Sequence, residues 1–151
     1  MERQLELLTN HPGMTLLCLT VQLPGPVKRN DISLKIADAG VCAVREAFSP
    51  EFEELRDLET GFEAFFLVSQ PPLDAKRLAC RIEDTHPLGR LMDIDVVVPF
   101  EVMVKPLGRE TLGLPSRKCL ICGRPVRECM RARTHTTEDL LAKISEMVDS
   151  Y

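Results

Sequence analysis

Two aspartates separated by a single isoleucine, Asp93 and Asp95, stand in an otherwise apolar run of the sequence. Successive side chains of a β-strand point to opposite faces, so a strand over 91–98 would place both carboxylates on one face. Carboxylates that lie close together raise each other's pKa unless a cation neutralises them. Mg²⁺, bound by carboxylates and by substrate phosphates, is suited to this position. The pattern predicts a magnesium site, and two solvated acids on an exposed strand are the alternative.

The two residues at 89 and 90, just before this strand, have side chains suited to a phosphate ligand. Gly89 allows close approach of the backbone to a ligand because it has no side chain. Arg90 offers a planar guanidinium whose donors match phosphate oxygens. Together with the aspartates they predict a site for a phosphate-bearing substrate and a metal.

A second group of chemically active residues follows in the C-terminal part of the chain, in the spacing C-x2-C-x6-C-x5-H: Cys119, Cys122, Cys129 and His135. Zinc is held tetrahedrally by thiolates and imidazole, and a C-x2-C pair commonly supplies the first two ligands. The array predicts structural zinc. One alternative is a reduced loop in which the cysteines pack as small apolar groups, and another is a cysteine nucleophile with His86 or His135 as its base.

Charge is distributed unevenly along the chain, whose formal net charge is −4. Six of its 19 basic residues but only one of its 23 acidic residues fall within 116–135. A basic segment on an acidic protein favours a local anionic partner, with a solvated basic surface as the alternative. General nucleic-acid binding is not expected, since such domains are usually basic overall.

The composition of the 151 residues, with 44% hydrophobic and 28% charged residues, is that of a globular protein with a real core. No run reaches the ~18 apolar residues of a membrane span, and the first residues lack a signal-peptide pattern, so we expect a cytoplasmic protein. Six cysteines are then expected to be thiols or metal ligands rather than disulfides. Cys18, Cys42 and Cys80 lie in apolar patterns and are predicted to be core residues.

The elements that must position these residues follow from hydrophobic periodicity and from proline and glycine breaks. The predicted strands are 14–23, 62–68, 91–98 and 102–105. The predicted helices are one that ends at 10, then 31–48, 74–84 and 137–148. The acidic stretch 51–59 is expected to be a surface loop or short helix. The order predicts an α+β fold with a mixed or largely antiparallel sheet, in which residues 1–115 form the catalytic domain and 116–151 pack on it.

Three blocks together resemble one known family, that of citrate lyase holo-acyl-carrier-protein synthase, also called apo-citrate lyase phosphoribosyl-dephospho-CoA transferase. The blocks are Pro24-Gly25-Pro26 followed by Lys28, the whole run 86–96, and a C-terminal set made up of Arg117, Cys119, Cys122, Cys129, Arg131 and His135. The resemblance covers essentially the whole chain from Glu2 onward. The run 86–96 combined with the cysteine array is highly specific, whereas the two aspartates alone would be a weak signal.

The resemblance implies a nucleotidyltransferase that attaches the 2′-(5″-triphosphoribosyl)-3′-dephospho-CoA group to a serine of the acyl carrier (gamma) subunit of citrate lyase and releases pyrophosphate. Asp93 and Asp95 would then hold Mg²⁺, and His86 or one of these acids would accept the serine proton. The residues expected to bind the CoA-derived substrate are Lys28, Gly89, Arg90, Arg117 and Arg131. The basic segment would grip this anionic substrate or dock an acidic carrier protein.

Two other kinds of function remain open from the residues alone. One is a different metal-dependent nucleotidyl or phosphoryl transferase with the same framework. The other is a zinc-organised binding module without catalysis, whose function would survive the loss of Asp93.

Overall fold

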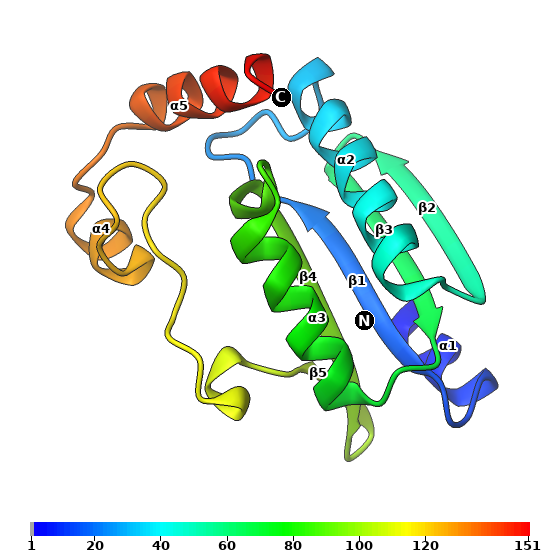
Figure 1. Ribbon diagram of the computed structural model, residues 1–151. Helices are drawn as coiled ribbons and strands as arrows, with labels where there is room; N and C mark the ends of the chain where they lie inside the picture. The colour runs from blue at the N-terminus through cyan, green and yellow to red at the C-terminus, as the bar shows by residue number, and fades with distance from the viewer. Residues whose placement is uncertain (1) are drawn as a thin grey trace.

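The computed structural model describes residues 2–151 and shows a five-stranded sheet in the order β2-β3-β1-β4-β5 (Figure 1). All four strand pairings are antiparallel, so the predicted α+β class is confirmed with a wholly antiparallel sheet. The strands are β1 (Thr15–Val21), β2 (Phe52–Leu58), β3 (Gly61–Val68), β4 (Met92–Phe100) and β5 (Met103–Pro106).

Helices cover both faces of this sheet, and two short 3₁₀ turns precede and follow the last strands. Helices α2 and α3 run over one face of the sheet, and α1 lies against the other (Figure 1). The helices are α1 (Glu2–Asn10), α2 (Asp31–Phe48), α3 (Pro72–Thr85), α4 (Val126–Ala132) and α5 (Thr137–Asp149), and the 3₁₀ turns are η1 (Gly89–Leu91) and η2 (Arg109–Leu112). No helix in 2–151 is both long and apolar enough to cross a membrane.

Strand β1 forms the centre of the fold and is buried on both of its faces. Leu17 and Leu19 belong to the larger core with α2 and α3, while Leu16 and Cys18 belong to the smaller core with α1. This double burial explains why the strand's sequence is a continuous apolar run rather than an alternating pattern. The strand therefore fixes β4, which is its neighbour and carries the aspartates.

The prediction for 51–59 was wrong, because these residues form the edge strand β2. Its side chains are charged or partly exposed because only one side of the strand pairs, and charge protects a sheet edge from further pairing. Ion pairs such as Arg3–Glu54 and Arg45–Glu53 stabilise it in place of apolar burial. The prediction that Cys42 is a core residue was also wrong, because Cys42 is exposed on α2.

The C-terminal segment closes the larger core. Helix α5 begins after Thr136, whose hydroxyl accepts a hydrogen bond of 3.0 Å from the backbone N–H of Asp139. Its residues Ile144 and Val148 pack in the same core as α2 and α3. The short helix α4, which periodicity did not predict, contains Cys129 and lies between Cys122 and α5.

Candidate active site and metal-ligand cluster

The two aspartates lie where strand β4 has an open edge. Asp93 and Asp95 are half-buried, whereas Ile94 between them is fully buried in the larger core, as strand alternation predicts. Strand β5 pairs with β4 only from Val97 onward. The outer edge of β4 beside the aspartates is therefore free of a partner strand.

Polar groups from three other segments satisfy the backbone at this edge. The carboxylate of Glu83 accepts a hydrogen bond of 2.8 Å from the backbone N–H of Ile94. The N–H of Leu107 donates to the carbonyl of Val96 over 2.9 Å. Arg117 donates from Nη1 to the carbonyl of Met92 over 2.8 Å. Because buried backbone groups need partners, these contacts hold the strand in place without a further strand.

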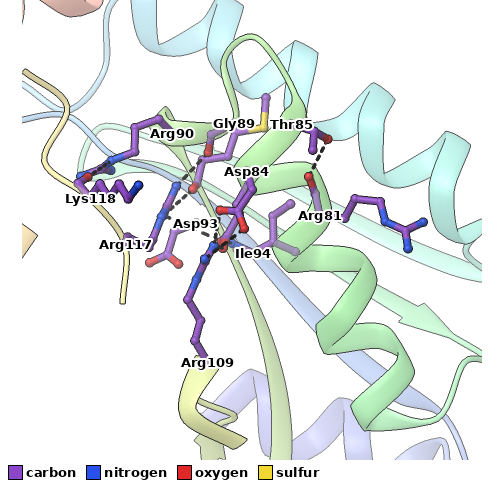
Figure 2. A network of polar contacts seen from close by, with 12 residues as sticks. Arg81, Asp84, Thr85, Gly89, Arg90, Asp93, Ile94, Arg109, Arg117 and Lys118 are labelled. Carbon is purple, nitrogen blue, oxygen red and sulfur yellow. Dashed lines mark hydrogen bonds and ion pairs between the residues drawn. The ribbon is translucent and has the colours of Figure 1, made fainter. Parts of the chain in front are cut away.

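Glu83 is the centre of a network of ion pairs around this edge. Figure 2 shows Arg109, Arg117 and Asp84, which belong to it or lie beside it. Arg109 places Nη2 2.7 Å from Oε1 of Glu83 and 3.0 Å from Oδ1 of Asp84. Nη1 of Arg117 lies 3.8 Å from Oε2 of Glu83. The buried Glu83 carboxylate is thus compensated by two arginines and a backbone donor, as a buried charge requires.

A cavity of about 460 Å³ opens beside this network. Both aspartates line it together with Lys76, Glu83 and Arg117. Lys76 is only 5% exposed and makes no hydrogen bond or ion pair within the described part of the chain. Sequence reasoning missed Lys76 and Glu83, although their spacing of two helical turns on the buried side of α3 was a usable signal.

Electrostatics at the aspartates favour the uptake of a cation. Burial, followed by the neighbouring Asp93, raises the pKa of Asp95 to about 6. Asp93 itself accepts a hydrogen bond of 3.1 Å from Nε2 of Gln22. Two aspartates that line one cavity, with hard carboxylate oxygen atoms and no cationic side chain paired to them among residues 2–151, fit the donor set that Mg²⁺ prefers.

Gly89 and Arg90 lie on the 3₁₀ turn η1, between α3 and β4. A Cβ atom at Gly89 would lie 2.3 Å from the carbonyl oxygen of Ile82, so the close approach made possible by this glycine is to helix α3. Arg90 donates from Nε to the carbonyl of Lys118 over 2.6 Å (Figure 2). Its guanidinium lines a second cavity rather than the aspartate cavity, and burial lowers its pKa.

His86 and Lys28 do not line the aspartate cavity. The imidazole of His86 accepts a hydrogen bond of 3.0 Å from the N–H of Leu88 and lies 5.5 Å from the ring of Tyr151. Burial lowers the pKa of His86. The ammonium of Lys28 donates to the carbonyl of Leu23.

The two predicted arginines of the C-terminal segment occupy different surroundings. Arg117 lines the aspartate cavity while its guanidinium donates to the carbonyls of Met92 and Gly89, over 2.8 and 2.9 Å. It therefore joins the segment to the aspartate strand. Arg131 is exposed on α4 and lines neither cavity.

The four residues of the cysteine array converge. One ligand atom from each lies within 4.8 Å of those of the others, so the cluster could hold a metal ion. Tetrahedral zinc with Zn–S bonds of ~2.3 Å requires sulfur separations of about 3.8 Å. Sγ of Cys122 lies 3.3 Å from Sγ of Cys129, and Nε of Arg124 donates to Sγ of Cys122 over 3.3 Å. The members of the cluster are Cys119, Cys122, Cys129 and His135.

The thiols of the cluster differ in acidity. The adjacent imidazole of His135, together with Arg124, lowers the pKa of Cys122 to about 5. The neighbouring Cys122 raises the pKa of Cys129 to about 11. The buried Nε2 of His135 has no hydrogen-bond partner among residues 2–151. These properties fit a ligand set for a metal better than a set of packed apolar thiols.

The structure thus defines the class of the protein. It is an antiparallel α+β protein with a carboxylate-lined cavity and a Cys₃His cluster that could hold a metal ion. Comparison with known proteins narrows this class. The chain belongs to the apo-citrate lyase phosphoribosyl-dephospho-CoA transferase family, which it matches over residues 1–151. The resemblance found from the motifs is thereby confirmed.

Individual relatives support the same assignment. A probable apo-citrate lyase phosphoribosyl-dephospho-CoA transferase of Streptococcus pyogenes serotype M18 is 36% identical over 152 residues, with 99% of this chain and 79% of the relative covered. A protein of the same name from Vibrio cholerae serotype O1, strain M66-2, is 39% identical over 155 residues, with 99% and 85% covered.

Proposed function

We propose that this chain transfers the 2′-(5″-triphosphoribosyl)-3′-dephospho-CoA group to a serine hydroxyl of the apo acyl carrier subunit of citrate lyase and releases pyrophosphate. Family membership supports the substrate and the acceptor, because the family is named for both. The observation that carries the chemistry is that Asp93, Asp95 and Lys76 line one cavity. The catalytic part is 1–115, nucleotidyltransferase-like in its use of paired carboxylates, and 116–151 pack on it.

At phosphorus the reaction forms one bond and breaks one, and one proton is transferred. The serine Oγ bonds to the α-phosphorus of the triphosphate, the bond from this phosphorus to the leaving pyrophosphate breaks, and the serine proton passes to a carboxylate. Such a transfer depends on positioning and on neutralising negative charge more than on a protein nucleophile. The cavity offers Lys76 and Arg117 for that neutralisation.

Asp93 and Asp95 would hold Mg²⁺, which supplies positive charge at the transferring phosphate when bound. The pKa of Asp95, raised to about 6 by burial and by Asp93, supports a role in which a cation compensates the pair. We assign acceptance of the serine proton to this carboxylate pair rather than to His86, since the pair lines the cavity and the imidazole does not.

The other residues that were predicted to bind the substrate have different roles. Gly89 fixes the turn on which Arg90 stands, and Arg90 keeps its Nη donors for the substrate, because only Nε is engaged within 2–151. Lys28 lies outside the cavity, so any contact with the substrate would involve a part distant from the aspartates. Arg131 is exposed and suits docking of an acidic carrier surface, together with the neighbouring exposed Arg127 and Arg133.

The Cys₃His cluster would hold a structural zinc ion. Zinc would tie the loop after Arg117 to α4 and to His135, two residues before α5. This segment has little apolar burial apart from two of the cysteines, so a metal would contribute much of its folding free energy. All six cysteines are free thiols, which suits a reducing cytoplasm.

The test is intact-mass spectrometry of apo carrier protein incubated with this protein, Mg²⁺ and the triphosphoribosyl substrate. We expect the carrier to gain the mass of the phosphoribosyl-dephospho-CoA group, and a carrier whose acceptor serine is replaced by alanine to gain nothing. Chelation of Mg²⁺ should stop the reaction. A carrier of unchanged mass under these conditions would refute the proposed transfer and favour the zinc-organised binding module.

A further inference from the structure

A second cavity, of about 350 Å³, lies between the core and the cysteine segment. Its walls are mainly apolar and include Leu91 on η1, Leu120 in the cysteine segment, and Leu140 and Ile144 on α5. Three of the four proposed metal ligands, Cys119, Cys129 and His135, also line it. The reaction proposed above does not say which part of the substrate occupies this space. Ligand cavities in proteins range from ~300 to ~1,000 Å³, so its size suits one compact group rather than an extended molecule.

This apolar cavity adjoins the aspartate cavity. Val126, the first residue of α4, lines both of them. Gln22 lines the apolar cavity, and its amide donates over 3.1 Å to Asp93, which lines the other. The two cavities therefore lie next to each other.

The polar groups at the apolar cavity are suited to a nucleobase. Arg90 is held at the wall by its 2.6 Å hydrogen bond from Nε to the carbonyl of Lys118. A guanidinium plane stacks well on a flat heteroaromatic ring. The side-chain amide of Gln22 can both donate and accept, as pairing with adenine requires.

We propose that the apolar cavity binds the adenine base of the CoA-derived substrate while the triphosphate lies at Asp93 and Asp95. This assignment rests on the proposed function and deepens it by naming a subsite. In the substrate the triphosphoribosyl group is attached at the 2′ position of the adenosine, so the base and the reacting phosphate are separated by only two linked riboses. Adjoining apolar and carboxylate-lined cavities match these two neighbouring parts of one molecule.

The experiment measures dissociation constants by calorimetry for two fragments of the substrate. Dephospho-CoA contains the adenine base, and 4′-phosphopantetheine contains the pantetheine arm without adenine. Leu140→Trp fills the apolar cavity, whereas Leu141→Trp changes the next residue, which is 38% exposed and does not line it. Pyrophosphate binding in the presence of Mg²⁺ reports separately on the aspartate cavity.

We expect Leu140→Trp to weaken dephospho-CoA binding by about tenfold or more, equal to about 1.4 kcal/mol, with Leu141→Trp and pyrophosphate binding unchanged. Gln22→Leu is a second variant, at an exposed position with little risk to folding, and should weaken dephospho-CoA binding about fivefold.

Equal dephospho-CoA affinity in wild type, Leu140→Trp and Gln22→Leu would overturn the adenine assignment. Binding of 4′-phosphopantetheine that depends on Leu140 would overturn it too, since the cavity would then hold the pantetheine arm. These results are independent of the transfer assay. If the wild-type protein carries out the transfer but its affinity for dephospho-CoA does not depend on Leu140, only the adenine subsite is refuted. If the affinity depends on Leu140 but the wild-type protein carries out no transfer, only the proposed function is refuted.

Discussion

Replacing Asp95 by asparagine should stabilise the metal-free protein at neutral pH while abolishing transfer. The carboxylate is half-buried in the aspartate cavity, and burial and Asp93 raise its pKa from an ordinary 3.8 to about 6. A folded-state pKa above the unfolded value means that the folded protein binds the proton more tightly. Stability from this group is therefore present below about pH 4 and is lost as the pH rises through about 6.

The size of the effect follows from the shift. Each pKa unit corresponds to about 1.4 kcal/mol, so a shift of about two units sets an upper bound of about 3 kcal/mol. Asp95 is partly exposed, and solvent screening reduces this to about 1.5 kcal/mol. Asparagine keeps the shape of the side chain and does not ionise, so Asp95→Asn should gain about that amount at neutral pH.

Urea unfolding in the presence of a chelator, followed by circular dichroism at about pH 7.5 and about pH 4, measures the effect. The gain in unfolding free energy should be present at the higher pH and nearly absent at the lower. The matched control is Asp38→Asn, at an exposed position on α2, which should change stability by less than about 0.5 kcal/mol. An Asp95→Asn variant with no gain, or with an equal gain at both pH values, would refute the electrostatic argument.

Three further substitutions test separate parts of the account. Lys76→Met should raise the KM for the triphosphoribosyl substrate about tenfold, because it removes a positive charge from the aspartate cavity. Lys35→Met, on the surface of α2, should leave KM unchanged. Equal KM values for the wild type and Lys76→Met would remove Lys76 from the site. Gly89→Ala should lower the free energy of unfolding in urea by about 3 kcal/mol, because the added Cβ would clash with the backbone of α3. Gly108→Ala should lower it little, because the nearest atoms to its Cβ belong to the movable carboxylate of Glu110. Similar losses for the two variants would contradict the packing of Gly89 against α3. Elemental analysis should find about one equivalent of zinc in the wild-type protein, and Cys122→Ser should lose this zinc and the ordered structure of the C-terminal segment. A wild-type protein that contains no zinc when purified without chelator would refute the zinc assignment.

Much of the fold was predictable because its main elements follow local patterns. The apolar run of β1, the alternation around Asp93 and Asp95, and the helical spacing of 31–48 correspond to observed elements. Strand β2 was missed because an edge strand, paired on one side and protected by charge, lacks the apolar alternation on which such a prediction depends. The short helix α4 was missed because seven residues give too few turns for a periodic signal.

The candidate site was predictable only where its residues are neighbours in sequence. The aspartates and the cysteine array carry recognisable spacings, and the structure brings each group together. Lys76 and Glu83 reach the cavity through the packing of α3 against β4. Their spacing of two helical turns indicates that they share one side of α3, but it does not indicate which strand that side packs against. Gly89 illustrates the opposite difficulty, since a glycine required by contact with α3 looks the same in the sequence as one required by a ligand.

The central claim is that the carboxylate pair carries out the transfer, and it is tested most directly by intact-mass spectrometry of the carrier with the doubly substituted Asp93→Asn, Asp95→Asn protein. With saturating Mg²⁺ and the triphosphoribosyl substrate, the wild-type protein should add one phosphoribosyl-dephospho-CoA group per carrier and release an equal amount of pyrophosphate. The doubly substituted protein, folded by circular dichroism, should add none. A carrier that gains the full mass at a comparable rate with the substituted protein would contradict the account.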